Sequence, residues 1–233
     1  MTDIDPPNSR LIHTFTVRWL VFLLGVPLTY AVIRYHVIQG VEWSHFPLYI
    51  ANKGCSLAAV FLIAGSYLIG KVLKIYEREP DKRRILIKFC GLMGFSLAGI
   101  HAFMSLLIVS PYYYPRFFQD GHKMNLTGEL SLLLGVLSLW CISITAITSL
   151  PVMYNAMGAD RWHRGQRMGY SALTLAAGHV LVMGFSGWLS PAGWPGILPP
   201  VSLLAFIAAV IPLLVKLLRP TLPASARKLR SRK

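Results

Sequence analysis

The chain has few acidic residues and few charged residues of any kind. Of its 233 residues, 9 are Asp or Glu and 14% are charged, whereas an ordinary soluble domain carries about 25% charged residues. The polar side chains are therefore too few to cover a surface in water. The net charge of +14 comes from basic residues that lie between apolar runs rather than along one face, so nucleic acid is not expected as a partner.

Several sequence signatures are also missing. The three cysteines, Cys55, Cys90 and Cys141, have no CxxC spacing and lie in apolar stretches, so we expect buried thiols. A Gly-rich dinucleotide fingerprint is absent, so oxidation of NAD(P)H would need another polypeptide. The N-terminal sequence MTDIDPPNSR lacks the charged region and cleavage site of a signal peptide.

Long apolar runs fill most of the chain, whose mean hydropathy is +0.54. A bilayer-spanning helix needs about 20 apolar residues, because a helix rises about 1.5 Å per residue. Spans are expected at 15–37, 48–72, 85–110, 128–150, 168–189 and 200–218. We therefore predict an all-α integral membrane protein, a six-helix transmembrane bundle over 15–218. A cytoplasmic segment, 1–14, precedes the bundle and a basic cytoplasmic tail, 219–233, follows it.

Basic residues gather in alternate connections between these spans. Those after the second span, after the fourth span and in the tail are Lys71, Lys74, Arg78, Lys82, Arg83, Arg84, Arg161, Arg164, Arg167, Lys216, Arg219, Arg227, Lys228, Arg230, Arg232 and Lys233. The intervening connections have only Arg116 and Lys123. The positive-inside rule therefore predicts that both termini are cytoplasmic. The expected location is the inner membrane of a bacterium.

Two histidines lie deep inside expected spans. His101 occurs in LAGIHAFMSLL and His179 in TLAAGHVLVMG, and an ionisable group within a span indicates a function. Each follows a basic cluster by about 22–25 Å of helix, so both imidazoles are expected at one level. The remaining histidines are expected in or beside loops as solvated or interfacial residues: His13, His36, His45, His122 and His163.

Two facing imidazoles in a helical bundle are typical of b-type haem ligation, in which each takes one axial position of the iron. Small residues precede both histidines and leave room for a flat group: Gly94, Ala98, Gly99, Ala172, Ala176, Ala177 and Gly178. Two alternatives remain. The small residues could serve helix packing while the histidines bond to backbone, or the histidines could bind another metal, although no carboxylate or cysteine accompanies them.

The stretch from Arg83 to His101 and the segment SLPVMYNAMGADRWHRGQRMGYSALTLAAGH resemble the ferric-reductase-like transmembrane domain superfamily, which includes MsrQ-like and STEAP-like haem b membrane proteins. The resemblance covers residues 85–220 and implies a haem-binding core over 85–190, with His101 and His179 as ligands. Relatives with a second, inner haem have further histidines where this chain has Lys88 and Gln166. The resemblance therefore implies a single haem b.

The same resemblance points to residues at the two ends of the bundle. Lys53 and Arg116 could pair with haem propionates, or Lys53 could simply reach the interface. FMN or FAD could bind at the cytoplasmic end, as could a quinone, because arginines hold phosphates and an indole stacks on a flavin ring. The candidates there are Trp162, Arg164, Gln166 and Arg167. The alternative is that these residues only follow the positive-inside rule and bind no cofactor.

The function that this pattern favours is transmembrane electron transfer, as the membrane subunit of an oxidoreductase. Whether the chain is itself a reductase or an electron relay stays open. Its expected partners are the lipid bilayer, an electron donor (a flavin reductase or quinol) and an acceptor on the outer side. Two alternative functions remain: a haem-free polytopic protein, such as a small transporter or an assembly partner, and a quinol-linked di-haem cytochrome b subunit.

Overall fold

A computed structural model describes residues 9–69, 80–119 and 123–218. The helices are α1 (Ser9–Val32), α2 (Ala51–Ile69), α3 (Pro80–Ile108), α4 (Leu126–Thr148), α5 (Pro151–Met157), α6 (Ala159–Trp188) and α7 (Val201–Leu218). Parts of the predicted terminal segments, 1–8 and 219–233, lie outside the described residues, as do Lys71, Lys74, Arg78 and His122.

The described residues contain six stretches that are long and apolar enough to cross a membrane: Val21–Ile38, Trp43–Ile69, Pro80–Ile108, Leu126–Thr148, Ala159–Trp188 and Pro195–Leu218. The six-helix fold class is thus confirmed. The largest difference from the predicted boundaries is at the fifth span. Helix α6 begins at Ala159, so Arg161, Arg164 and Arg167 lie on a helix and not in a loop.

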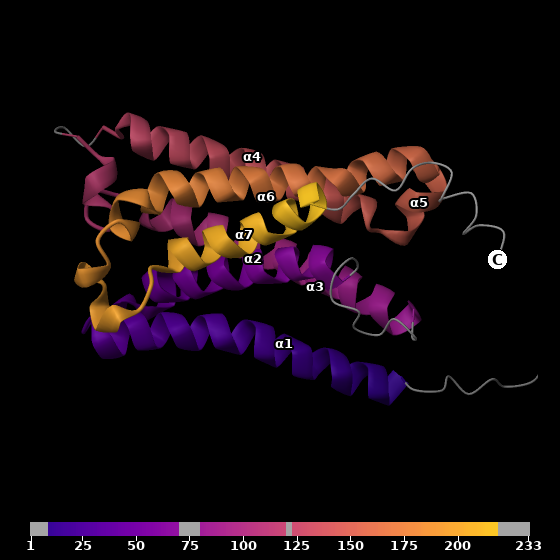
Figure 1. Cartoon of the computed structure of the whole chain (residues 1–233), viewed down its shortest axis with the longest axis horizontal. Coiled ribbons are helices and arrows are strands. Elements are labelled where there is room, and N and C mark those ends of the chain that lie inside the picture. Colours follow the sequence, from indigo (N-terminus) through magenta and orange to yellow (C-terminus); the bar gives the residue numbers. More distant parts are fainter. Residues whose placement is uncertain (1–8, 70–79, 120–122, 219–233) are drawn as a thin grey trace, which may run out of the picture.

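The long helices lie side by side along the long axis of the molecule (Figure 1). The start of α1 and the end of α7 lie at the same end of the bundle, which also carries α5 and is called the α5 end below. Helix α2 packs against α1, α3 and α7, whereas α6 packs against α4 and α7. Helices α3 and α6, which carry the two deep histidines, are not extensively packed on one another.

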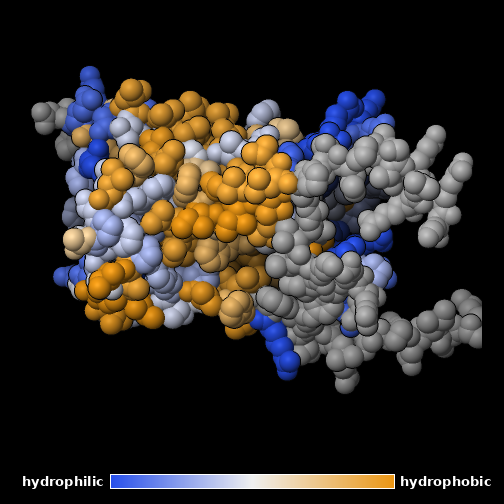
Figure 2. All heavy atoms as spheres, in the orientation of Figure 1, coloured by the Kyte–Doolittle hydropathy of each residue, from blue (hydrophilic) through white to orange (hydrophobic). Residues whose placement is uncertain are grey.

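On the face shown in Figure 2, hydrophobic residues fill the middle of the bundle and hydrophilic residues lie toward the two ends. Large apolar side chains are exposed on the membrane-spanning helices, among them Phe103, Trp140 and Phe185. An exposed apolar surface of this extent on a bundle of long helices indicates contact with a membrane. The distribution agrees with the expected bilayer span.

Small residues bring neighbouring helices together. A Cβ added to Gly94 on α3 would lie 2.7 Å from Cγ1 of Ile63 and 3.1 Å from the carbonyl oxygen of Ala59, both on α2. Between α4 and α6, hydroxyl groups bond to main-chain oxygens. For example, Ser138 Oγ donates to the Ala172 carbonyl oxygen at 2.8 Å. Polar groups within a bilayer must be satisfied inside the protein, so these contacts fix α6 against α4.

Two short π-helices lie at the end opposite α5. They span Ile33–Ile38, directly after α1, and Phe46–Ile50, directly before α2. A π-helix is rare and often occurs at a functional site, since its extra residue per turn redirects side chains. Here the first π-helix contains Arg34 and Tyr35, and the second contains Tyr49. All three residues belong to the cluster of cations and tyrosines described below.

The close approach at Gly94 gives a stability prediction. We expect Gly94→Ala to lower the free energy of unfolding by about 1–3 kcal/mol, because the added methyl group meets backbone atoms of α2 that cannot move easily. Thermal unfolding in detergent micelles measures the change. Gly91→Ala on the same helix is the matched control, since its Cβ would meet only Ser66 Oγ at 4.0 Å. Equal stability of the two variants would contradict the prediction.

Candidate functional site

His101 on α3 is held by a side chain of α2. Its Nδ1 donates a hydrogen bond to Oδ1 of Asn52 at 2.7 Å. Asn52 is 2% exposed, and its Nδ2 donates to Oγ of Ser105, one turn beyond His101, at 3.0 Å. An amide oxygen can only accept, so the imidazole proton is on Nδ1.

His179 on α6 is held by the backbone of α4. Its Nδ1 donates to the carbonyl oxygen of Ser131 at 2.8 Å, and Oγ of Ser131 lies 3.1 Å from the same nitrogen. A Cβ added to Gly135, one turn further along α4, would lie 3.1 Å from this Nδ1. The absence of a side chain at Gly135 thus lets the ring lie against α4.

Both histidines therefore present Nε2, with its lone pair, as the unbonded nitrogen. Among the described residues, Nε2 of His36 is the only buried side-chain nitrogen or oxygen that lacks a hydrogen-bond partner. The Nε2 atoms of His101 and His179 lack a partner too, so they are not completely buried. Both side chains are half-buried. The two imidazoles also lie within electrostatic range of each other. The two helices are not packed together, and each presents an imidazole nitrogen that is free to bind, which is what a flat group with two open axial positions requires.

A cluster of cations and tyrosines lies at the end opposite α5. The Lys53 ammonium is 4.4 Å from the ring centroid of Tyr49, 5.0 Å from that of Tyr35 and 5.9 Å from that of Tyr114. Burial raises the pKa of Tyr114, so its phenol stays neutral. Rings that face an ammonium group stabilise it through their quadrupoles. We call Lys53 and these three tyrosines the Lys53 cage.

Two further cations lie within electrostatic range of Lys53, namely Arg34 and Arg116. Arg34 is 6% exposed and donates from Nε to the carbonyl oxygen of Pro199 at 3.1 Å. Arg116 is exposed, and its guanidinium lies 4.8 Å from the ring centroid of Phe117. Among the described residues, no carboxylate pairs with any of these three cations. Like charges gathered without a counter-ion favour an anionic ligand. Because Lys53 follows Asn52, the cage adjoins the His101 site.

The candidate residues at the α5 end have two kinds of environment. Trp162 donates from Nε1 to the Thr148 carbonyl oxygen at 2.8 Å. Nε2 of Gln166 donates to Thr145 O, Thr148 Oγ1 and Ser149 Oγ at 3.2, 2.9 and 3.1 Å. These two side chains join α6 to α4, whereas Arg164 and Arg167 are exposed on α6. Two of the four candidate residues are therefore bonded to α4, and the other two are exposed.

Another histidine differs from its predicted environment. His36 was expected to be solvated or interfacial, but it is 7% exposed and stacks on Trp43 with ring centroids 4.0 Å apart. Its Nδ1 donates to the Val41 carbonyl oxygen at 2.7 Å. Cys90 and Cys141 are buried as predicted, and Cys55 is partly buried. In the described ranges, no group of three or more His, Cys, Asp or Glu side chains could hold a metal ion.

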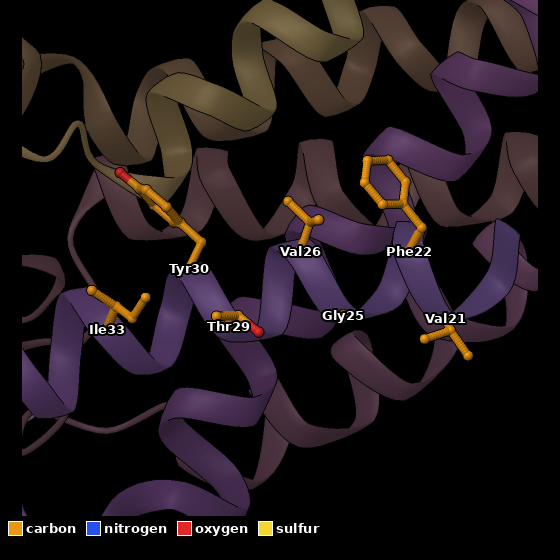
Figure 3. A pocket seen from close by; sticks show the side chains of 7 residues that line it. All are labelled: Val21, Phe22, Gly25, Val26, Thr29, Tyr30 and Ile33. Atoms are coloured by element: carbon orange, nitrogen blue, oxygen red, sulfur yellow. The ribbon is translucent and has the colours of Figure 1, made fainter. Parts of the chain in front are cut away.

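A shallow groove on α1 is separate from this site. The side chains of Phe22, Val26 and Tyr30 extend from the same side of α1 (Figure 3), and neither deep histidine lines the groove. The groove is lined by Val21, Phe22, Gly25, Val26, Thr29, Tyr30 and Ile33. Six of these residues lie on α1, and Ile33 begins the π-helix that follows it. The lining is mostly apolar, as expected of a surface that faces lipid.

Sequence patterns did not identify Asn52 or Ser131 as functional residues. Asn52 offered one signal, because it is a polar residue at the start of an apolar run. Ser131 offered none, since a serine is common in a membrane helix and its contribution here comes largely from a main-chain oxygen.

Fold and site together define a six-helix membrane protein with paired imidazoles in its interior and a cationic cluster at one end. The chain is 26% identical to Metalloreductase STEAP2 of Mus musculus and 25% identical to that of Homo sapiens. Each match covers 82% of this chain but 44% of the relative, so the chain spans less than half the length of these curated relatives. No family model matches the chain. The matches support homology to metalloreductases of the ferric-reductase-like kind.

The bonds of Gln166 give a second stability prediction. Gln166→Leu should lower the free energy of unfolding by about 1–3 kcal/mol, because it removes the hydrogen bonds that the Gln166 amide donates to Thr145, Thr148 and Ser149. Thermal unfolding in micelles tests this. Arg167→Leu, at the neighbouring exposed position, should change stability by about 0.5 kcal/mol or less. If both variants were as stable as the wild type, Gln166 would not join the helices as described.

Proposed function

We propose that this chain is the membrane domain of an electron-transfer protein and binds a single haem b between His101 and His179. The observation that carries the proposal is the state of the two imidazoles. Each donates from Nδ1 to a fixed oxygen, and each has Nε2 available for iron. Metal-ligating histidines usually have this arrangement, because the second hydrogen bond fixes both tautomer and ring orientation.

The remaining residues of the site have complementary roles in this proposal. Haem bound here would supply one-electron chemistry, with its potential set by the axial ligands and their surroundings. Asn52 and the Ser131 carbonyl orient the two rings. Lys53 and Arg116, with Arg34 close by, would pair with the propionates, since cations without a carboxylate partner in the protein favour a carboxylate ligand. The adjacency of Asn52 and Lys53 supports this arrangement.

The electron path follows from the charge distribution. The α5 end carries exposed Arg164 and Arg167, and basic residues favour the cytoplasmic side. We infer that electrons enter at this end from a flavin or quinol and leave at the Lys53 cage, on the outer side of a cytoplasmic membrane. The two arginines are the candidates for a flavin phosphate or an acidic donor protein. The name of the relatives supports an oxidised metal ion as the acceptor.

The structure gives less support to the other two functions. A di-haem cytochrome b needs a second histidine pair nearer the α5 end, but Lys88 is exposed and Gln166 is bonded to α4. A haem-free transporter or assembly partner would leave two oriented imidazoles in the bilayer without a ligand, and ionisable groups at this depth are costly.

An optical difference spectrum tests the haem proposal. The purified wild-type protein, reduced with dithionite, should show a sharp b-type α-band with about one haem per chain by pyridine haemochrome. His101→Ala and His179→Ala should each lose the bound haem, because each removes an axial ligand. His163→Ala is the control, since His163 is exposed on α6. A full haem content in both ligand variants, or a folded, haem-supplied wild type without the band, would overturn the proposal.

A second prediction concerns the propionates. Lys53→Met should speed the loss of haem to apomyoglobin about 10- to 100-fold, because a charge-assisted hydrogen bond is worth about 1.5–3 kcal/mol. Lys216→Met is the matched control, since Lys216 also lies over a tyrosine ring, that of Tyr170 at 4.1 Å, but at the α5 end. Equal rates for the two variants would place the propionates away from Lys53.

A further inference from the structure

We propose that Asn52 is a positioning residue that sets the reduction potential of the bound haem through its hydrogen bond to His101. The inference rests on the proposed haem function and extends it to a residue that does not touch the haem. It also distinguishes the two ligands: His101 is held by an exchangeable side chain, whereas His179 is held by the backbone.

The geometry around Asn52 leaves its amide little freedom. Asn52 is almost fully buried between α2 and α3, and its Oδ1 lies 2.7 Å from Nδ1 of His101. Its Nδ2 donates to Ser105 Oγ, so the amide oxygen, rather than the amide nitrogen, must face the imidazole. Ser105 Oγ lies 3.4 Å from the same imidazole nitrogen. The side chains of Asn52, His101 and Ser105 thus contact one another.

The partner of His179 is of another kind. A main-chain carbonyl oxygen accepts its Nδ1 proton, and no substitution at position 131 removes that oxygen. A side chain at position 135 would crowd the ring, so the backbone of α4 itself sets this ligand. Substitution can therefore vary the acceptor strength directly at His101 but not at His179.

Acceptor strength at Nδ1 controls how strongly the imidazole donates electrons to iron. A stronger acceptor gives the ring more imidazolate character and raises its basicity. A more basic axial ligand stabilises ferric over ferrous iron, which lowers the reduction potential. A neutral amide is an intermediate acceptor, weaker than a carboxylate and stronger than none. Asn52 therefore holds the potential between two extremes that substitution can reach.

Redox titration of the purified, haem-loaded protein tests this proposal. Asn52→Asp should have a lower midpoint potential than the wild type, because a carboxylate accepts more strongly. Asn52→Leu, which has the same number of side-chain heavy atoms but no acceptor, should have a higher one. Ser66→Ala is the matched control. Ser66 is a buried polar residue of the same helix, but its hydroxyl donates to the Ile63 carbonyl oxygen one turn earlier and not to a histidine. Its midpoint should equal that of the wild type.

The low-spin ferric signal in electron paramagnetic resonance gives a second readout, since it should move in opposite directions in the Asp and Leu variants and stay unchanged in Ser66→Ala. If the Asn52 variants do not fold, Ser105→Ala is the alternative, because it keeps Asn52 but removes the anchor of its amide. That variant should shift the midpoint in the direction predicted for Asn52→Leu.

The outcomes separate this inference from the proposed function. A wild type without haem overturns both. A haem-loaded wild type whose midpoint and ferric signal are unchanged in Asn52→Asp and Asn52→Leu, or in Ser105→Ala, overturns the role of Asn52 and leaves the histidine ligands in place. Shifts of both Asn52 variants in the same direction would also contradict it, since they would report general disturbance of the site rather than acceptor strength.

Discussion

Each deep imidazole donates a hydrogen bond from Nδ1, and the chemistry available to this bundle depends on those two bonds. Within a bilayer no water replaces a missing partner, so an imidazole nitrogen that bears a proton needs an oxygen supplied by the protein. Asn52 supplies it to His101 and the Ser131 backbone supplies it to His179. Both rings consequently present Nε2. In the other tautomer, Nε2 would carry the proton and would have no lone pair for a ligand.

The helix packing serves the same requirement. Helix α4 can offer a carbonyl oxygen to His179 only because Gly135 leaves space for the ring, and because Ser138 and Gln166 hold α4 and α6 together. On the other side, the close contact at Gly94 brings α2 against α3, so that Asn52 reaches His101. The two halves, α2–α3 and α4–α6, are packed internally, while α3 and α6 stay apart.

Charge is distributed so that the two ends of the bundle differ. At one end, Lys53 lies within electrostatic range of Arg34 and Arg116 among tyrosine rings, without a carboxylate partner among the described residues. At the α5 end, Arg164 and Arg167 are exposed. An anion in the cage and an acidic or phosphorylated partner at the α5 end are the ligands that these two environments favour. The proposed direction of electron flow joins the two ends through the histidine pair.

The six spans and the two deep histidines, His101 and His179, could be predicted from the sequence, because a bilayer demands long apolar runs and an ionisable residue within such a run is conspicuous. What those histidines contact depends on how the helices pack. Asn52 and Ser131 are 49 and 48 residues from their imidazole partners, and no local periodicity encodes so distant a pairing. Helix packing also explains why Trp162 and Gln166 bond to α4, which could not be expected from the basic residues around them in the chain. Helix propensity and hydropathy act over one or two turns, whereas the acceptor of a buried proton depends on which helix face is packed opposite.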